Sequence, residues 1–171
     1  SVVGRVNGAF AHYVVADVPQ VVPKPARFTF EQASGIPIAG MAAYGAAEAA
    51  DIRPGQRVAI IGAAGGAGSA AVDVVHAKGG KVIAAAHSSQ EAWLKQQGVE
   101  EFVAYDKENV AARIRDVDAV LNMVDGQAGP ALAYVKRGGR LASIAGPPPE
   151  EQCTAAGIAC VQIRATAPGM T

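Results

Sequence analysis

Neither sign of charge is in excess in this sequence. Its 171 residues include 15 lysines and arginines and 15 aspartates and glutamates, so the formal net charge at pH 7 is zero. A chain without net charge has no overall field that would attract a polyanion. We therefore expect no nucleic acid among its partners.

Long apolar runs are missing as well. No segment approaches the roughly 20 consecutive apolar residues that a membrane-spanning helix needs, and no basic start followed by an apolar core indicates a signal peptide. These absences predict that the protein has no membrane partner and that it is cytoplasmic.

Cysteine is scarce, because the chain has only Cys153 and Cys160. Their spacing is poor for a small zinc site, and two cysteines are too few for a disulfide scaffold. Neither has an adjacent basic group that would activate its thiol. We expect both to be small apolar packing residues in a reducing compartment.

Small residues are abundant between residues 57 and 76. An apolar strand that begins at Arg57 runs into a glycine-rich turn and then into a helix. The turn has the pattern Ala63-x-Gly65-x-x-Gly68, with alanine where the usual G-x-G-x-x-G pattern has its first glycine. Gly65 would let a pyrophosphate approach the backbone, and Gly68 would let the helix pack tightly on the strand. The pattern predicts a dinucleotide-binding site, and the alternative is a glycine-rich turn without a ligand.

The second expected strand, over residues 81–86, decides which dinucleotide is favoured. It ends in His87-Ser88-Ser89, and no acidic residue stands where NAD-binding folds carry one for the adenosine ribose. Hydroxyl and imidazole groups without a carboxylate would accept a 2′-phosphate, so the sequence favours NADP(H) over NAD(H). The alternative is that Ser88 or Ser89 only caps the following helix.

The rest of the chain alternates between strand and helix patterns, which is typical of an α/β fold. Further strands are expected over residues 8–15, 101–105, 118–124, 140–145 and 158–165, and helices over 38–51, 90–97 and 127–136. Asp106 is a candidate cap for a helix after the third parallel strand, and Gly138-Gly139 is expected to end the helix over 127–136. The series from Arg57 onward predicts a Rossmann-type, doubly wound parallel sheet of six strands.

Several segments resemble the medium-chain dehydrogenase/reductase superfamily, in particular its zinc-independent quinone oxidoreductase branch. The similar segments are residues 8–14, 30–33, 36–44, 53–58, 63–68, 136–141 and 144–146. They follow one another in the family's order over nearly the whole chain.

The resemblance implies a division of the chain into three parts. Residues 1–29 would be remnant strands of the N-terminal GroES-like barrel domain, 30–56 linker helices, and 57–171 a dinucleotide-binding domain truncated at its C-terminus. The implied activity is hydride transfer from NADPH to a quinone or an α,β-unsaturated carbonyl, and the chain would be the cofactor-binding portion, inactive by itself. The alternative is a noncatalytic nucleotide-binding or interaction fragment.

The resemblance also implies a set of cofactor contacts, from the pyrophosphate to the nicotinamide. They are Ala64, Gly65, Gly66, Ala67, His87, Ser88, Ser89, Tyr105, Asn122, Val124, Ile144 and Gly146. For Tyr105 the alternative is a strand-end aromatic that is half buried against the sheet. For Asn122 it is a buried amide that satisfies loop backbone.

No catalytic side chain and no metal ligand is expected. Ile38 stands where zinc-dependent relatives place a ligand cysteine, and Ile cannot bind a metal. In such reductions the cofactor supplies the hydride while the protein orients the reactants. The apolar strand over 158–165 would lie at a sheet edge, so we also expect a homodimer through that edge.

Overall fold

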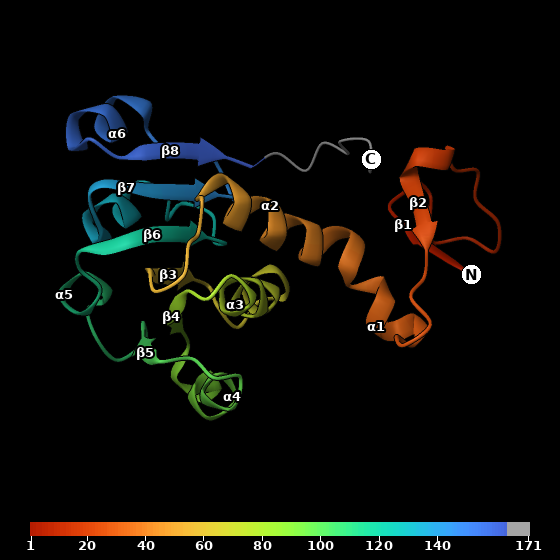
Figure 1. Cartoon of the computed structure of the whole chain (residues 1–171), viewed down its shortest axis with the longest axis horizontal. Coiled ribbons are helices and arrows are strands. Elements are labelled where there is room, and N and C mark those ends of the chain that lie inside the picture. The colour runs from red at the N-terminus through yellow and green to blue at the C-terminus, as the bar shows by residue number, and fades with distance from the viewer. Residues whose placement is uncertain (164–171) are drawn as a thin grey trace.

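A computed structural model describes residues 1–163, and from β3 onward its strands and helices alternate (Figure 1). The strands are β1 (Val2–Gly4), β2 (Val21–Pro23), β3 (Arg57–Ile61), β4 (Lys81–Ala86), β5 (Glu101–Ala104), β6 (Val117–Asn122), β7 (Val135–Ser143) and β8 (Ala159–Gln162). The α-helices are α1 (Phe30–Ser34), α2 (Met41–Ala49), α3 (Gly66–Ala77), α4 (Glu91–Gln96), α5 (Val110–Arg113) and α6 (Glu150–Ala156). Short turns of other helix types are η1 (Val18–Gln20), η2 (Ile36–Gly40), η3 (Ser88–Gln90) and η4 (Pro130–Tyr134).

Six strands form one parallel sheet in the order β5-β4-β3-β6-β7-β8. The chain builds outward from β3 to β5 on one side and then from β6 to β8 on the other. The point between β3 and β6 is therefore the topological switch point, where open α/β sheets bind their ligands. The expected doubly wound, six-stranded sheet is confirmed.

Helices cover both faces of the sheet, so the central strands are buried on both sides. Val58 and Ile60 of β3 belong to the core under α2, α3 and α4, whereas Ala59 and Ile61 belong to the core under α5, η4 and α6. This division follows from the two-residue period of a strand. It explains why β3 and β4 are nearly continuous apolar runs.

The turn between β3 and α3 is the tightest packing contact of the sheet with a helix. Gly62 has φ 84°, which favours glycine, and it lets the chain leave the strand sharply. A Cβ on Gly68 would overlap the carbonyl oxygen of Gly62 and lie 2.8 Å from the Cα of Ala63. The predicted role of Gly68 is confirmed, and Gly62 supplies the turn glycine for which the sequence pattern offered Ala63.

The N-terminal strands form a separate antiparallel pair in which Val2 lies opposite Pro23. Figure 1 shows this pair beyond α1, away from the parallel sheet. The expected strand over 8–15 was wrong, because residues 8–15 contain no strand and Phe10 and Tyr13 are exposed. No described strand pairs with this segment, and an unpaired strand leaves its backbone groups unsatisfied.

The expected helix over 127–136 was also wrong. Only the short turn η4 forms there, with Pro130 at its start, and β7 begins at Val135. Gly138 and Gly139 lie inside β7, where the register with β6 shifts between Val117 and Ala119. The glycine pair therefore marks a bulge in the strand, with Gly138 at φ 78°, and does not end a helix.

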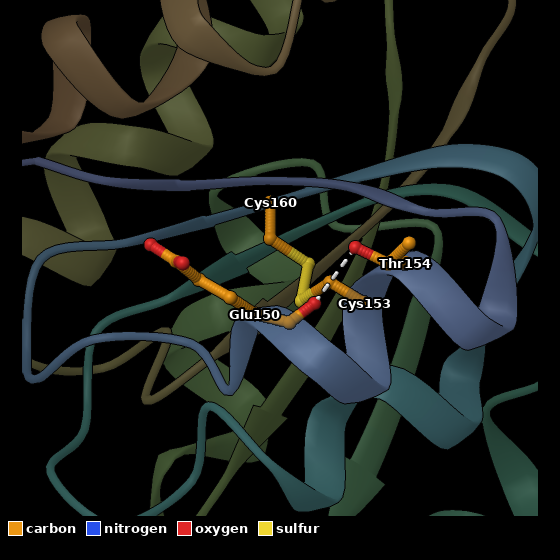
Figure 2. The surroundings of a disulfide bond; sticks show 4 residues. All are labelled: Glu150, Cys153, Thr154 and Cys160. Atoms are coloured by element: carbon orange, nitrogen blue, oxygen red, sulfur yellow. Dashed lines mark hydrogen bonds between the residues drawn. A yellow bond between two sulfur atoms is a disulfide. The ribbon is translucent and has the colours of Figure 1, made fainter.

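The two cysteines form a disulfide, which corrects their expected role as separate apolar packing residues. Figure 2 shows the bond from Cys153 on α6 to Cys160 on β8, and their Cα atoms are 6.1 Å apart. Gly157 ends α6 at φ 67° and turns the chain back beside the helix, which brings the sulfur atoms together. The disulfide removes the cysteine-based reason for expecting a reducing compartment.

Within residues 1–163, every helix is too short or too polar to cross a membrane. The edge strand β8 ends at Gln162. Residues 164 and 165 of the strand expected over 158–165 lie outside the described residues. The cytoplasmic location and the proposed domain boundaries stay predictions.

Replacing Gly68 with alanine should destabilise the fold. We expect Gly68→Ala to lower the free energy of unfolding by about 2–3 kcal/mol, because the new methyl group meets backbone atoms that cannot move aside. Gly66→Ala is the matched control, since its Cβ would lie 3.7 Å from the nearest atom, the Ala39 methyl. Urea unfolding of both variants checks this, and equal losses would contradict it.

Breaking the disulfide should also lower stability. Closing a loop of this length lowers the conformational entropy of the unfolded chain and so stabilises the fold by about 2 kcal/mol. Cys160→Ser should therefore lower the melting temperature by about 4–8 °C. Dithiothreitol should lower the melting temperature of the natural chain by the same amount and leave that of the variant unchanged. A melting temperature that does not change when mass spectrometry shows complete reduction would refute the prediction.

Candidate functional site

A cleft of ≈ 700 Å³ opens at the carboxyl ends of β3, β4 and β6. Its position over the switch point is the one at which α/β sheets bind ligands. Seven of the expected contacts line it: Ala64, Gly65, Gly66, Ala67, His87, Tyr105 and Val124. Five do not line it: Ser88, Ser89, Asn122, Ile144 and Gly146.

The first turn of α3 forms an anion-binding end of the cleft. Gly65 is the N-cap in an extended conformation, and the N–H groups of the first turn have no partner within the helix. They carry the positive end of the helix dipole. Cβ atoms on Gly65 and Gly66 would meet nothing closer than 3.4 Å and 3.7 Å, so the protein itself does not require glycine there. Glycine at these positions leaves room for a phosphate group to approach the backbone.

The end of β4 carries a hydrogen-bonded cluster that the sequence did not predict. Ser88 donates two hydrogen bonds to the carboxylate of Asp106, from its N–H and from its hydroxyl, each at 2.7 Å. The Nε2 atom of His87 lies 3.6 Å from the same carboxylate. The hydroxyl of Ser88 lowers the pKa of Asp106, so this carboxyl group is ionised at neutral pH.

The expectation that no carboxylate lies at this end of the cleft was therefore wrong. Ala86 of β4 lies opposite Ala104 of β5, so the residues that follow the two strands meet at one edge of the sheet. Asp106 comes from the strand beside β4, whereas the sequence pattern considers only the residues that follow β4 itself. Asp106 is not a helix cap either, because Asn109 accepts the N–H of Ala111 and caps α5.

The capping role considered for the serines belongs to His87. Its Nδ1 atom accepts the N–H of Ser89 at 3.2 Å at the start of η3. Beside it lies Tyr105, which is 56% exposed and whose ring centroid is 6.0 Å from that of His87 in an edge-on arrangement. Both rings form part of the cleft wall, and with about half of Tyr105 exposed its two interpretations both stay open.

At the end of β6 the structure favours the alternative for Asn122. Its side chain is fully buried, donates to the hydroxyl of Ser143 at 3.0 Å and accepts the N–H of Val124 at 3.3 Å. The amide therefore ties β6 to β7 and holds the loop after β6 in place. Val124, which this hydrogen bond positions, does line the cleft.

The two expected contacts after β7 lie outside the cleft. The N–H of Ile144 donates to the carbonyl of Asn122, and the side chain packs against the core under α3. Gly146 has φ 81°, and a Cβ there would lie 3.2 Å from the Asp125 carboxylate. Their expected role beside a nicotinamide stays a prediction.

Sequence reasoning missed several residues that line the far end of the cleft. Examples are Gln90, Val110, Gln127 and Tyr134. Val110, Gln127 and Tyr134 lie in or beside the connections on the face of the sheet opposite α3, and no sequence motif marks them. Tyr134 falls in the segment for which the sequence predicted a longer helix.

In the described part of the chain, residues 1–163, no three His, Cys, Asp or Glu side chains lie together as a metal site would need. The chemistry that this cleft offers is therefore backbone N–H groups at one end, a His–Ser–Asp cluster at the rim, and apolar walls. This combination suits a phosphorylated ligand with a flat ring.

The chain matches no family model, but known proteins are similar to it in sequence and in structure. The 2-methylene-furan-3-one reductase of Solanum lycopersicum is 31% identical over 141 residues, which are 81% of this chain and 36% of that protein. A quinone oxidoreductase from Coxiella burnetii superimposes with a TM-score of 0.82 at 26% identity, over 90% of this chain and 50% of that one.

Another quinone oxidoreductase, from Thermus thermophilus and solved also in complex with NADPH, has a TM-score of 0.74 and 30% identity over 85% of this chain and 50% of its own. The chain thus spans about half the length of the solved relatives. Similarity in both sequence and fold, over most of its residues, shows that the chain belongs to the medium-chain dehydrogenase/reductase superfamily, with quinone oxidoreductases and enoyl reductases as its structural neighbours.

Proposed function

We propose that the chain is the NADP(H)-binding portion of a zinc-independent oxidoreductase that transfers hydride from NADPH to a quinone or an α,β-unsaturated carbonyl. The observation that carries the proposal is the cleft over the switch point, with the first turn of α3 as its anion-binding end. The relative from Thermus thermophilus, which was solved with NADPH, and the reductase from tomato support the cofactor and the reaction class.

The residues of the cleft fit such a cofactor by their chemistry. Backbone N–H groups at Gly65, Gly66 and Ala67 are proposed to hold the pyrophosphate; those of Gly66 and Ala67 lie in the first turn of α3, whereas that of Gly65 donates to the carbonyl of Gly62 at 3.1 Å and would have to exchange partners. His87 and Tyr105 would lie at the adenosine ribose, and Ile144 and Gly146 would lie toward the nicotinamide. When bound, NADPH supplies the hydride, and the role of this chain is to orient it and to keep water out.

The preference for NADP(H) depends on the electrostatic interaction between a 2′-phosphate and the cluster of His87, Ser88 and Asp106. Both carboxylate oxygens of Asp106 already accept hydrogen bonds from Ser88, and His87 lies against one of them. Because the Nδ1 atom of His87 accepts the N–H of Ser89, its Nε2 carries the ring proton, faces this carboxylate and offsets part of its charge. Asp106 would still weaken the binding of NADPH by direct repulsion. The selectivity for NADPH is thus a balance between these two side chains.

A noncatalytic nucleotide-binding or interaction fragment is the second candidate. It shares the cleft and the cofactor with the first candidate, and the two differ only in turnover.

A homodimer through the edge of β8 belongs to the same proposal. β8 is the outermost strand after β7, and among residues 1–163 only its side toward β7 is paired. Soluble proteins usually pair or cover such an edge.

Cofactor selectivity should respond to charge beside Ser88. We expect titration calorimetry to show tighter binding of NADPH than of NADH. Ser88→Asp should weaken NADPH binding about tenfold, and Asp106→Asn should strengthen it by about fivefold with little effect on NADH. Asp73→Asn, on the exposed side of α3, is the control. The same affinity change for both cofactors would show that Asp106 does not act on the 2′-phosphate.

Turnover separates the two candidate functions. We expect these 171 residues to bind NADPH without oxidising it when 1,2-naphthoquinone is added, because the chain spans about half of its solved relatives. The decrease in absorbance at the NADPH band measures this. Steady-state oxidation by the chain alone would exclude the noncatalytic candidate.

A further inference from the structure

Tyr134 is a polar residue of the cleft that the cofactor contacts proposed so far do not include. It is the last residue of η4, on the face of the sheet opposite α3, and only 7% of it is exposed. Its ring packs in the core of that face, a cluster to which Ala131 and Leu141 also belong. Burial raises the pKa of its phenol, so the hydroxyl keeps its proton at neutral pH and can donate it in a hydrogen bond.

The hydroxyl of Tyr134 has no hydrogen-bond partner among residues 1–163. In that part of the chain every fully enclosed polar side-chain atom has a partner. The hydroxyl is therefore not fully enclosed by residues 1–163, and Tyr134 lines the cleft. A buried tyrosine usually finds a partner for its hydroxyl. A ligand in the cleft can supply that partner.

The surroundings of Tyr134 indicate which part of a ligand would meet it. Ile61 and Ala85, from the ends of β3 and β4, line the same cleft, as does Val110 at the start of α5. These side chains provide apolar walls suited to a flat ring. The phosphate-binding turn of α3 follows β3 on the opposite face of the sheet, and His87 lies at the end of β4.

We propose that the hydroxyl of Tyr134 hydrogen-bonds to the nucleobase of the bound dinucleotide and contributes to the affinity for its adenosine half. This inference rests on the proposed function, because it takes the cleft to be the cofactor site. The pyrophosphate would lie on α3 and the ribose beside His87. The part of the cleft on the face of the sheet opposite α3 is then left for the base. Tyr134 is then a hydrogen-bonding residue, with Gln127 nearby in the same lining, of a slot whose walls are mostly apolar, where a few polar contacts add specificity.

The test compares the natural chain with Tyr134→Phe, which removes only the hydroxyl. By titration calorimetry we expect the affinity for NADPH, NADH and ADP to fall by the same factor, about fivefold, as for one lost hydrogen bond. ADP carries the base without the nicotinamide, so an equal loss places the contact in the adenosine half. Tyr13→Phe is the control, because it also removes one phenol hydroxyl, but Tyr13 is 94% exposed and does not line the cleft.

The melting temperature distinguishes a ligand contact from a structural role. Since the hydroxyl has no partner within residues 1–163, Tyr134→Phe should melt at the same temperature as the natural chain or slightly higher. Unchanged affinity for all three ligands, or a lower melting temperature with unchanged affinity, would overturn the inference and leave the proposed function standing. A natural chain that binds none of the three would overturn both.

Discussion

The close approach of α3 to the end of β3 is the constraint on which the rest of this structure depends. No side chain fits between the first turn of the helix and the carbonyl of Gly62, so Gly68 is required by the protein's own backbone. This contact directs the start of the helix over the switch point of the sheet. A looser turn would move the free N–H groups away from the cleft, and the anion-binding end would be lost.

Of the four glycines in that turn, the fold requires Gly62 and Gly68 but not Gly65 and Gly66. Gly62 provides a positive φ and Gly68 provides the close contact, whereas an alanine at position 65 would meet only the Gly62 carbonyl, at 3.4 Å. A small residue at position 65 therefore leaves space on the side of the cleft. This difference links the packing of the domain to its proposed function, because the two glycines that the fold does not require, Gly65 and Gly66, are those proposed to lie at the pyrophosphate.

The rim of the cleft combines opposite electrostatic tendencies. The α3 N-terminus attracts anions, while Asp106 places a carboxylate at the end of β4 and is held there by two hydrogen bonds from Ser88. The selectivity of such a site depends on the balance between these two charges and on His87, whose Nε2 atom lies 3.6 Å from that carboxylate. Neither tendency alone determines which dinucleotide the chain would prefer.

The sequence by itself determined the features that local chemistry controls. Apolar runs of strand length, glycines at strand ends and the turn before α3 were enough to predict the six parallel strands and seven of the residues that line the cleft. These features depend on side-chain size and on φ within a few neighbouring residues. For the same reason, the glycine pair at 138 and 139 was misinterpreted, because a helix stop and a strand bulge share that local signal.

Only the tertiary structure decided which residues from distant segments meet. Asp106 lies beside Ser88 because β5 pairs with β4, and Cys153 bonds Cys160 because α6 folds back along β8. Tyr134 reaches the cleft because η4 is short and packs on the second face of the sheet. Asn122, expected to contact the cofactor, is buried against Ser143 of the neighbouring strand. Each of these outcomes depends on strand order and helix placement, and residue patterns along the chain do not encode such contacts locally.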